Sequence, residues 1–359
     1  MLQVGTSLGD LLHGRTNRVG FDQMKWPHFE RMGKHKRFLL QKSIHVTNRI
    51  ARYLSPILAP VITYMAKTGV GTDRCLRWGS LPMLVHFYSP VPDLTDLEHR
   101  QVWDRKSPLV GIDFRPDAQI EFLLDLGQRF GSECNWPSEP QANPAQFYTE
   151  NGTFSYGCAA ISHCILRHFK PRHVIEVGSG NSSLVISKAV SLNAKDSAEP
   201  IEYSVLDPYP RSIIENGLSG VTQIIKEPVE RMETGFFDRM CKNDVLFIDS
   251  GHTVRIGGDV NYLILDVLPR LAPGVIVHFH DIGLPYEYPK VYSTNPKFRV
   301  FWTEAYLLQA FLCFNSQFEI LLAMSYLMTE HLDKFRAAFP LYDPVQHRAS
   351  SGSFWIRRK

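Results

Sequence analysis

The chain has 359 residues, 44% of them hydrophobic and 12% aromatic, which is enough for a buried core and excludes a disordered chain. Its formal net charge of +3 is small, so we expect no nucleic-acid partner. The six cysteines form no CxxC pair, and the N-terminus lacks the pattern of a signal peptide. We therefore expect neither a zinc ribbon nor a disulfide scaffold, and we predict a cytoplasmic protein.

The N-terminal part is basic. Residues 1–80 hold 13 Lys and Arg against 4 Asp and Glu, so the rest of the chain is mildly acidic. The most apolar stretch, 53–65, is too short to span a bilayer and carries two prolines. We treat 1–100 as a mainly helical, basic extension, and we keep open peripheral contact of 1–80 with a membrane as well as a plain solvated helix.

Residues 101–155 are predicted to form a helical cap and linker. Two loops rich in proline flank the segment 116–130, whose apolar residues Ile120, Leu123, Leu124 and Leu126 predict one buried helix face.

From about residue 156 short apolar runs alternate with helical patterns, which is typical of an α/β domain. The predicted strands are 173–177, 201–206, 221–225, 244–249, 274–281, 318–323 and 353–358. The predicted helices are 156–169, 182–194, 211–218, 229–240, 258–271 and 304–315. We expect 156–359 to be a catalytic domain with a doubly wound, mostly parallel, seven-stranded sheet that ends in an antiparallel pair. Ligands in such folds bind beyond the carboxyl ends of the strands.

The first of these strands runs into a loop of glycines and small polar residues. The loop consists of Glu176, Val177, Gly178, Ser179, Gly180, Asn181, Ser182 and Ser183. Glycines let the backbone approach a ligand, and the free N–H groups at the start of the next helix favour an anionic group. Ser183 stands where a dinucleotide fingerprint requires glycine, which argues against NAD. A tight turn without a ligand is the alternative.

Acidic residues follow the next two strands. Asp207 can accept hydrogen bonds from ribose hydroxyls, although a turn-forming aspartate before Pro208 explains it as well. Glu227 could approach an adenine or be solvated, and the sequence does not separate the two.

The fourth and fifth strands end in "IDSGH" and "HFHD". The fold should bring Asp249 and His252 next to His280 and Asp281 on one rim. Four titratable groups at adjacent strand ends indicate acid–base or metal chemistry. His278 lies one pleat deeper, and we expect it to be structural.

These motifs make the chain similar to class I S-adenosylmethionine-dependent methyltransferases with a Rossmann-like fold, in particular to metal-dependent sugar O-methyltransferases. The resemblance covers about 156–281 in motifs and the tail in layout. It implies a cofactor loop, with Ser182 where many members carry a third glycine, and a ribose acid. The cofactor-binding residues it implies are Glu176, Gly178, Ser179, Gly180, Asn181, Ser182, Asp207 and Asp249.

The resemblance also implies a divalent metal on Asp249 and Asp281 and a catalytic pair of His252 as base with Asp249. His280 occupies the place of an acid in the metal-binding pair of this family. Imidazole is a poor magnesium ligand, so the metal is left open among magnesium, manganese and iron, or absent.

The predicted reaction is O-methylation of a hydroxyl on a saccharide or secondary metabolite. Aromatic and polar residues beyond the rim (Tyr286, Tyr288, Trp302, Glu304 and Tyr306) suit a sugar or ordinary packing equally well. One alternative is a metal-dependent hydroxylase of similar fold. Another is a non-catalytic cofactor-binding scaffold that acts through the basic extension. The sequence leaves the oligomeric state open.

Overall fold

The computed structural model describes residues 44–197, 200–296, 299–347 and 351–359. The chain divides into two compact units, 1–97 and 98–359. The basic residues predicted within 1–43 lie outside the described residues. Residues 101–155 lie in the second unit, where Leu123 and Leu126 join the core, whereas Leu124, predicted on the same face, is 36% exposed.

The first unit contains the helices α3 (Ile44–Thr68) and α4 (Thr72–Leu76), and α5 (Leu94–His99) begins at its end. From Ile50 to Leu97 no side chain is classed as buried. No helix among the described residues is both long and apolar enough to cross a bilayer.

The second unit is built on a seven-stranded sheet with the order β3-β2-β1-β4-β5-β7-β6. Its strands are β1 (His173–Val177), β2 (Glu202–Leu206), β3 (Gln223–Ile225), β4 (Val245–Ile248), β5 (Ile276–Phe279), β6 (Phe318–Ala323) and β7 (Phe354–Arg358). The first five pair in parallel, and β7 runs antiparallel to both β5 and β6. The predicted fold class is therefore confirmed.

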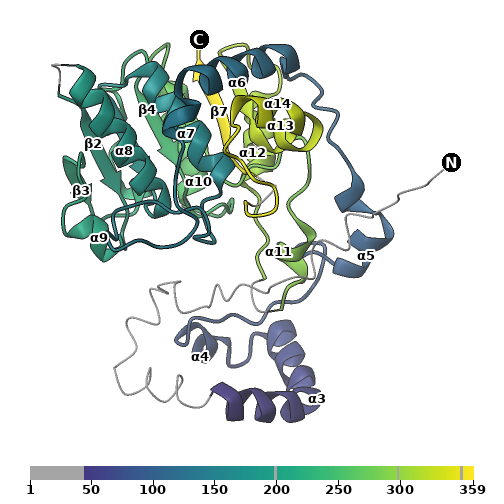
Figure 1. The fold of residues 1–359 in the computed structure, drawn as a ribbon. Helices are drawn as coiled ribbons and strands as arrows, with labels where there is room; N and C mark the ends of the chain where they lie inside the picture. The colour runs from purple at the N-terminus through teal and green to yellow at the C-terminus, as the bar shows by residue number, and fades with distance from the viewer. Residues whose placement is uncertain (1–43, 198–199, 297–298, 348–350) are drawn as a thin grey trace. The chain divides into compact units, whose positions relative to one another are not determined.

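Helices cover both faces of this sheet, as a parallel sheet requires. Successive strand residues point to opposite faces, so Val245 and Phe247 join one core and Leu246 and Ile248 the other. The first core includes α6, α7 and α8, of which Figure 1 shows the last two lying across the sheet. The helices of this unit are α6 (Pro116–Phe130), α7 (Tyr156–Phe169), α8 (Asn181–Asp196), α9 (Ser212–Glu215), α10 (Asp259–Asn261), α11 (Lys290–Thr294), α12 (Glu304–Leu312), α13 (Met324–Glu330) and α14 (Leu332–Ala338).

Some predicted helices take another form. The segment 229–240 contains two short 3₁₀ helices, Val229–Arg231 and Thr234–Phe237, because Pro228 and Gly235 interrupt a regular helix. The segment 258–271 changes from α10 to a π-helix, Tyr262–Val267, and ends in a 3₁₀ turn at Pro269, which cannot donate a helical hydrogen bond. The helices α13 and α14 were not predicted.

The carboxyl ends of the central strands lie level with one another. Hydrogen bonds continue one residue past the strands, from Asp249 N–H to Val177 O and from His280 N–H to Ile248 O, both at 2.9 Å. Gly178 N–H likewise donates to Leu206 O at 2.9 Å. The loops after β1, β2, β4 and β5 therefore meet at one rim.

Candidate active site

The loop after β1 touches the end of β4 directly. Gly178 has φ +80°, and a Cβ atom there would lie 1.8 Å from the carbonyl oxygen of Asp249. No other residue fits this position, whether or not a ligand is bound. A Cβ atom on Gly180 would meet no atom within 4 Å, so open space lies beside the loop there.

Glu176 holds this loop from below. Its carboxylate is fully buried and accepts hydrogen bonds from Ser182 Oγ at 2.7 Å, from Ser183 Oγ at 2.8 Å and from the Tyr203 hydroxyl. Burial raises the pKa of Glu176 to about 7, although the three hydroxyls act in the opposite direction. Serine replaces glycine in this motif because its hydroxyl fastens the first turn of α8 to the buried acid.

Asp207, at the end of β2, is hydrogen bonded to the same loop. Its Oδ2 accepts from Ser179 N–H at 3.0 Å and from the Ser179 hydroxyl, and its Oδ1 accepts from Tyr209 N–H at 2.7 Å. Asn181 is held by Arg211, which donates to its Oδ1 at 2.9 Å, and donates to Thr153 Oγ1 at 2.8 Å. The predicted cofactor residues thus form one continuous, half-exposed edge.

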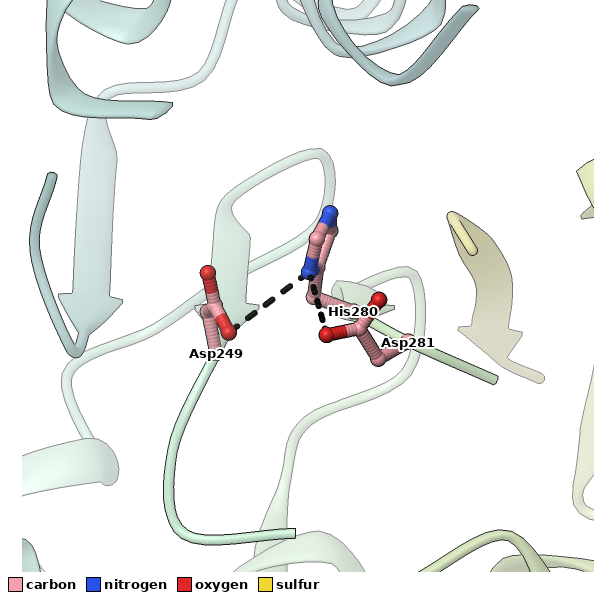
Figure 2. A group of neighbouring side chains, drawn as sticks. All are labelled: Asp249, His280 and Asp281. Carbon is pink, nitrogen blue, oxygen red and sulfur yellow. Dashed lines mark ion pairs between the residues drawn. The ribbon is translucent and has the colours of Figure 1, made fainter. Parts of the chain in front are cut away.

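Asp249, His280 and Asp281 converge at the ends of β4 and β5 (Figure 2). His280 Nδ1 lies 3.6 Å from Asp249 Oδ1 and 3.5 Å from Asp281 Oδ2, and one potential ligand atom from each residue lies within 4.8 Å of the others. His280 is 4% exposed, and within the described part of the chain neither ring nitrogen has a hydrogen-bond partner. A buried imidazole without partners, facing two carboxylates, fits a cation ligand set.

The charges of this cluster support each other. Burial disfavours a charged imidazole, but Asp281 and Asp249 outweigh it and raise the pKa of His280 well above its usual value. Burial would raise the pKa of Asp249, yet His280 and His252 hold it well below the usual range. Without a metal, the protonated imidazoles compensate the carboxylates.

His252 lies beside this cluster in a fixed orientation. Its backbone adopts a left-handed conformation with φ +53°, and its carbonyl accepts hydrogen bonds from the N–H groups of Thr303 and Glu304 at 2.9 and 3.1 Å. Its Nε2 lies 3.3 Å from Asp249 Oδ1 and 3.8 Å from Asp281 Oδ2. The ring is therefore held at the rim next to both predicted metal-binding acids.

Glu304 holds the other side of the His252 ring. Its Oε2 lies 2.8 Å from His252 Nδ1, and the carboxyl group is 1% exposed. Burial lowers the pKa of His252, but the carboxylates of Asp249 and Glu304 outweigh it and raise this pKa to about 10. A carboxylate on Nδ1 fixes the tautomer and the direction of Nε2.

Sequence reasoning named Glu304 only as a substrate-side residue, because 52 residues separate it from His252. It also missed Gly352, where a Cβ atom would lie 2.6 Å from Asp281 Cα, and Phe154, which stacks on His280 with ring centroids 5.2 Å apart. No local motif marks these residues. A buried-type acid at the start of a helix was the one available signal for Glu304.

The aromatic residues beyond the rim are mostly used for packing. The hydroxyl groups of Tyr286, Tyr288 and Tyr306 have partners in Glu330, Ala305 N–H and Glu287. Trp302 differs, because its half-buried ring lies against His252 with centroids 4.4 Å apart. Trp302 is the aromatic residue nearest the chemistry.

Two other sequence-predicted residues lie away from the rim cluster. His278 is fully buried, stacks on Phe247 at 3.8 Å and contacts Ser353 Oγ at 3.1 Å, as a structural residue does. Glu227 is exposed and accepts from Arg231 at 3.3 Å.

Two hollows of about 340 and 430 Å³ open elsewhere on the second unit. The first is lined by residues of 111–115 and 312–320 with Lys359, and the second by 106–114 with Pro285 and Tyr326. No predicted cofactor or metal residue lines either one, so the site is argued from its chemistry and not from cavity size.

Comparison with known proteins agrees with this architecture. The model of a family described as a methyltransferase domain matches residues 175–282, from β1 to just beyond β5. This central part of the chain is therefore a methyltransferase-type domain, which supports the expectation that the chain is a methyltransferase.

Two individual proteins are similar to the chain. An uncharacterized protein of Archaeoglobus fulgidus is 27% identical over 165 residues, covering 44% of this chain and 73% of its own length. The crystal structure of S-adenosylhomocysteine-bound Podospora anserina methyltransferase PaMTH1 aligns with 78% of this chain and all of its own, at 17% identity and a TM-score of 0.33. Neither similarity is high enough to assign a ligand or substrate.

Proposed function

We propose that the protein is an S-adenosylmethionine-dependent O-methyltransferase whose acceptor is a hydroxyl of a saccharide or secondary metabolite. The observation that carries the proposal is the fixed His252 ring, held between Glu304 and Asp249 at the rim that the glycine loop of a methyltransferase domain forms. An oriented imidazole is what a weakly acidic hydroxyl needs and what a more acidic thiol would need less.

The cofactor is expected along Gly178 to Ser182, beside the open space at Gly180, with its ribose at Asp207. S-adenosylmethionine supplies a methyl group on a sulfonium, and its transfer forms a C–O bond, breaks the C–S bond and leaves S-adenosylhomocysteine and the hydroxyl proton. Asp207 must exchange part of its bonding to Ser179 for the ribose hydroxyls, which its half-exposed position allows.

His252 is the proposed proton acceptor. Because Glu304 is bonded to Nδ1, the opposite nitrogen, Nε2, faces the rim. The carboxylates on both sides stabilise the ring once it carries the proton, which is the property of a strong base. Asp249 holds this nitrogen in position from the end of β4.

Asp249, His280 and Asp281 are the proposed ligands of a divalent cation, which would lower the pKa of the acceptor hydroxyl. The imidazole in this set favours manganese or iron over magnesium, because magnesium prefers oxygen ligands.

The acceptor is expected to lie against the Trp302 ring. A sugar ring packs its C–H face on an aromatic side chain, and Trp302 combines this surface with contact to the base. The tyrosine hydroxyls nearby already have protein partners, so they contribute less to acceptor recognition than the sequence suggests.

Calorimetric titration with S-adenosylmethionine and S-adenosylhomocysteine, with and without manganese, tests the cofactor. Asp207→Ala should abolish saturable binding, whereas the exposed Asp333→Ala, with the same charge change, should bind as the unchanged protein does. A Gly178 variant is unsuitable, because any Cβ atom there collides with Asp249. Equal binding by Asp207→Ala, or none by the folded parent protein, would refute the proposal.

The acceptor class is tested by S-adenosylhomocysteine release over a panel of sugars, phenols and thiols. Turnover with alcohols that His252→Ala abolishes, while its cofactor affinity is retained, supports the assignment. Turnover restricted to thiols would contradict O-methylation.

The imidazole in the cluster also favours a second candidate, a metal-dependent hydroxylase. Oxygen consumption that depends on added iron and on His280 would favour it, whereas cofactor-dependent methyl transfer without oxygen uptake would exclude it.

A further inference from the structure

The first unit carries most of the exposed large apolar side chains. Sixteen of the 27 among the described residues fall between Ile50 and Tyr88. Eight of them belong to α3, namely Ile50, Tyr53, Leu54, Ile57, Leu58, Val61, Ile62 and Tyr64. Scattered single residues of this kind are ordinary, but a concentration in one short segment marks a binding surface.

The side chains of α3 are divided between two faces. At 100° per residue, the eight apolar residues and Met65 occupy one half of the helix, which we call the apolar stripe. The other half holds small, polar and basic residues, namely Arg52, Ser55, Pro56, Ala59, Pro60, Thr63, Ala66 and Lys67. The stripe runs the length of a 25-residue helix, about 37 Å.

The second face is built for water. Pro56 lacks an N–H, so the carbonyl of Arg52 loses its usual helical partner, and Ser55 Oγ donates to it at 3.0 Å. The prolines thus lie on the polar half and leave the apolar stripe continuous.

Charge distinguishes between occupants of the stripe. The segment 44–68 contains three basic residues and no Asp or Glu, and 1–80 as a whole carries 13 basic against 4 acidic residues. Two copies of α3 packed together would bring like charges side by side. An anionic lipid surface complements the charge and takes up the apolar side chains.

We infer that α3 binds an anionic membrane surface and lies in its interfacial layer with the apolar stripe inserted. Exposed apolar residues after the helix extend the contact, and they include Leu76, Trp78, Leu81, Phe87 and Tyr88. This inference does not depend on the proposed methyl transfer.

Flotation of the full-length protein with phosphatidylcholine vesicles, with and without phosphatidylglycerol, tests the inference. The protein should float only with the anionic vesicles, and added salt should weaken the binding. Ile57→Gln with Val61→Gln in the stripe should weaken it at least about tenfold. Ser55→Gln with Ala59→Gln on the opposite face is the matched control and should bind normally.

Thermal unfolding of each variant verifies that the second unit is intact. No binding to either vesicle type would overturn the inference, as would equal loss in both variants. Sedimentation analysis covers the other occupant: a parent dimer that the stripe variant converts to monomer, without vesicle binding, would identify a second copy as the partner and overturn it too.

Discussion

Replacing Glu176 by glutamine should change how stability depends on pH. Glu176 is fully buried under the glycine loop, and burial raises its pKa from 4.5 to about 7. The folded state therefore binds a proton that the unfolded state has already lost between these two values. A carboxyl group with a raised pKa makes folding less favourable as pH rises through this window.

The size of the effect follows from the shift. Each pK unit corresponds to about 1.4 kcal/mol, so between about pH 5 and about pH 8 the group costs the folded state about 2–3 kcal/mol. The glutamine side chain resembles the neutral acid in shape and does not titrate. Relative to the unchanged protein, the variant should gain about 2–3 kcal/mol on going from the lower to the higher pH.

Urea unfolding followed by tryptophan fluorescence measures this difference, with the buried Trp355 among the reporters. The exposed Glu139→Gln is the control, and its stability should keep the pH dependence of the parent. An identical pH dependence for Glu176→Gln and the parent would refute the reasoning, because it would mean that Glu176 titrates in its ordinary range.

Three further predictions concern the rim and the core. Glu304→Gln should lower turnover about 10–100-fold by releasing His252 Nδ1, with S-adenosylmethionine affinity unchanged in calorimetry; equal activity would show that Glu304 does not position the base. Asp281→Asn should weaken manganese binding at least about tenfold in direct titration, and unchanged affinity would remove it from the ligand set. Arg167→Met should lower the free energy of unfolding by about 3 kcal/mol, because it leaves Glu133, now bonded at 2.9 and 3.2 Å, without its arginine; a change under about 1 kcal/mol in urea unfolding would contradict this.

Local pattern was enough for the central elements. His173–Val177, Tyr156–Phe169 and Phe318–Ala323 begin and end where the sequence predicts, because strands covered on both sides are short apolar runs bounded by polar residues. The order of these elements also fixed which strand ends are neighbours. The meeting of Asp249 with His280 and Asp281 was therefore predictable, although their roles remain predictions.

The short elements between the strands were less predictable. The segment 229–240 has helical composition but forms two 3₁₀ turns, since a short segment depends on its packing and on Pro228 and Gly235 more than on propensity. The helices α13 and α14 between the last two strands left no signal that we recognised.

The sequence by itself determined the strand and loop residues of the rim, because each motif acts within a few residues of its own strand. Only the tertiary structure decided what surrounds them. Glu304 reaches His252 from the start of α12, and Gly352 packs on Asp281 from the chain before β7. Such contacts join residues 50 or more positions apart, and they depend on how helices and strands pack, which no local pattern encodes.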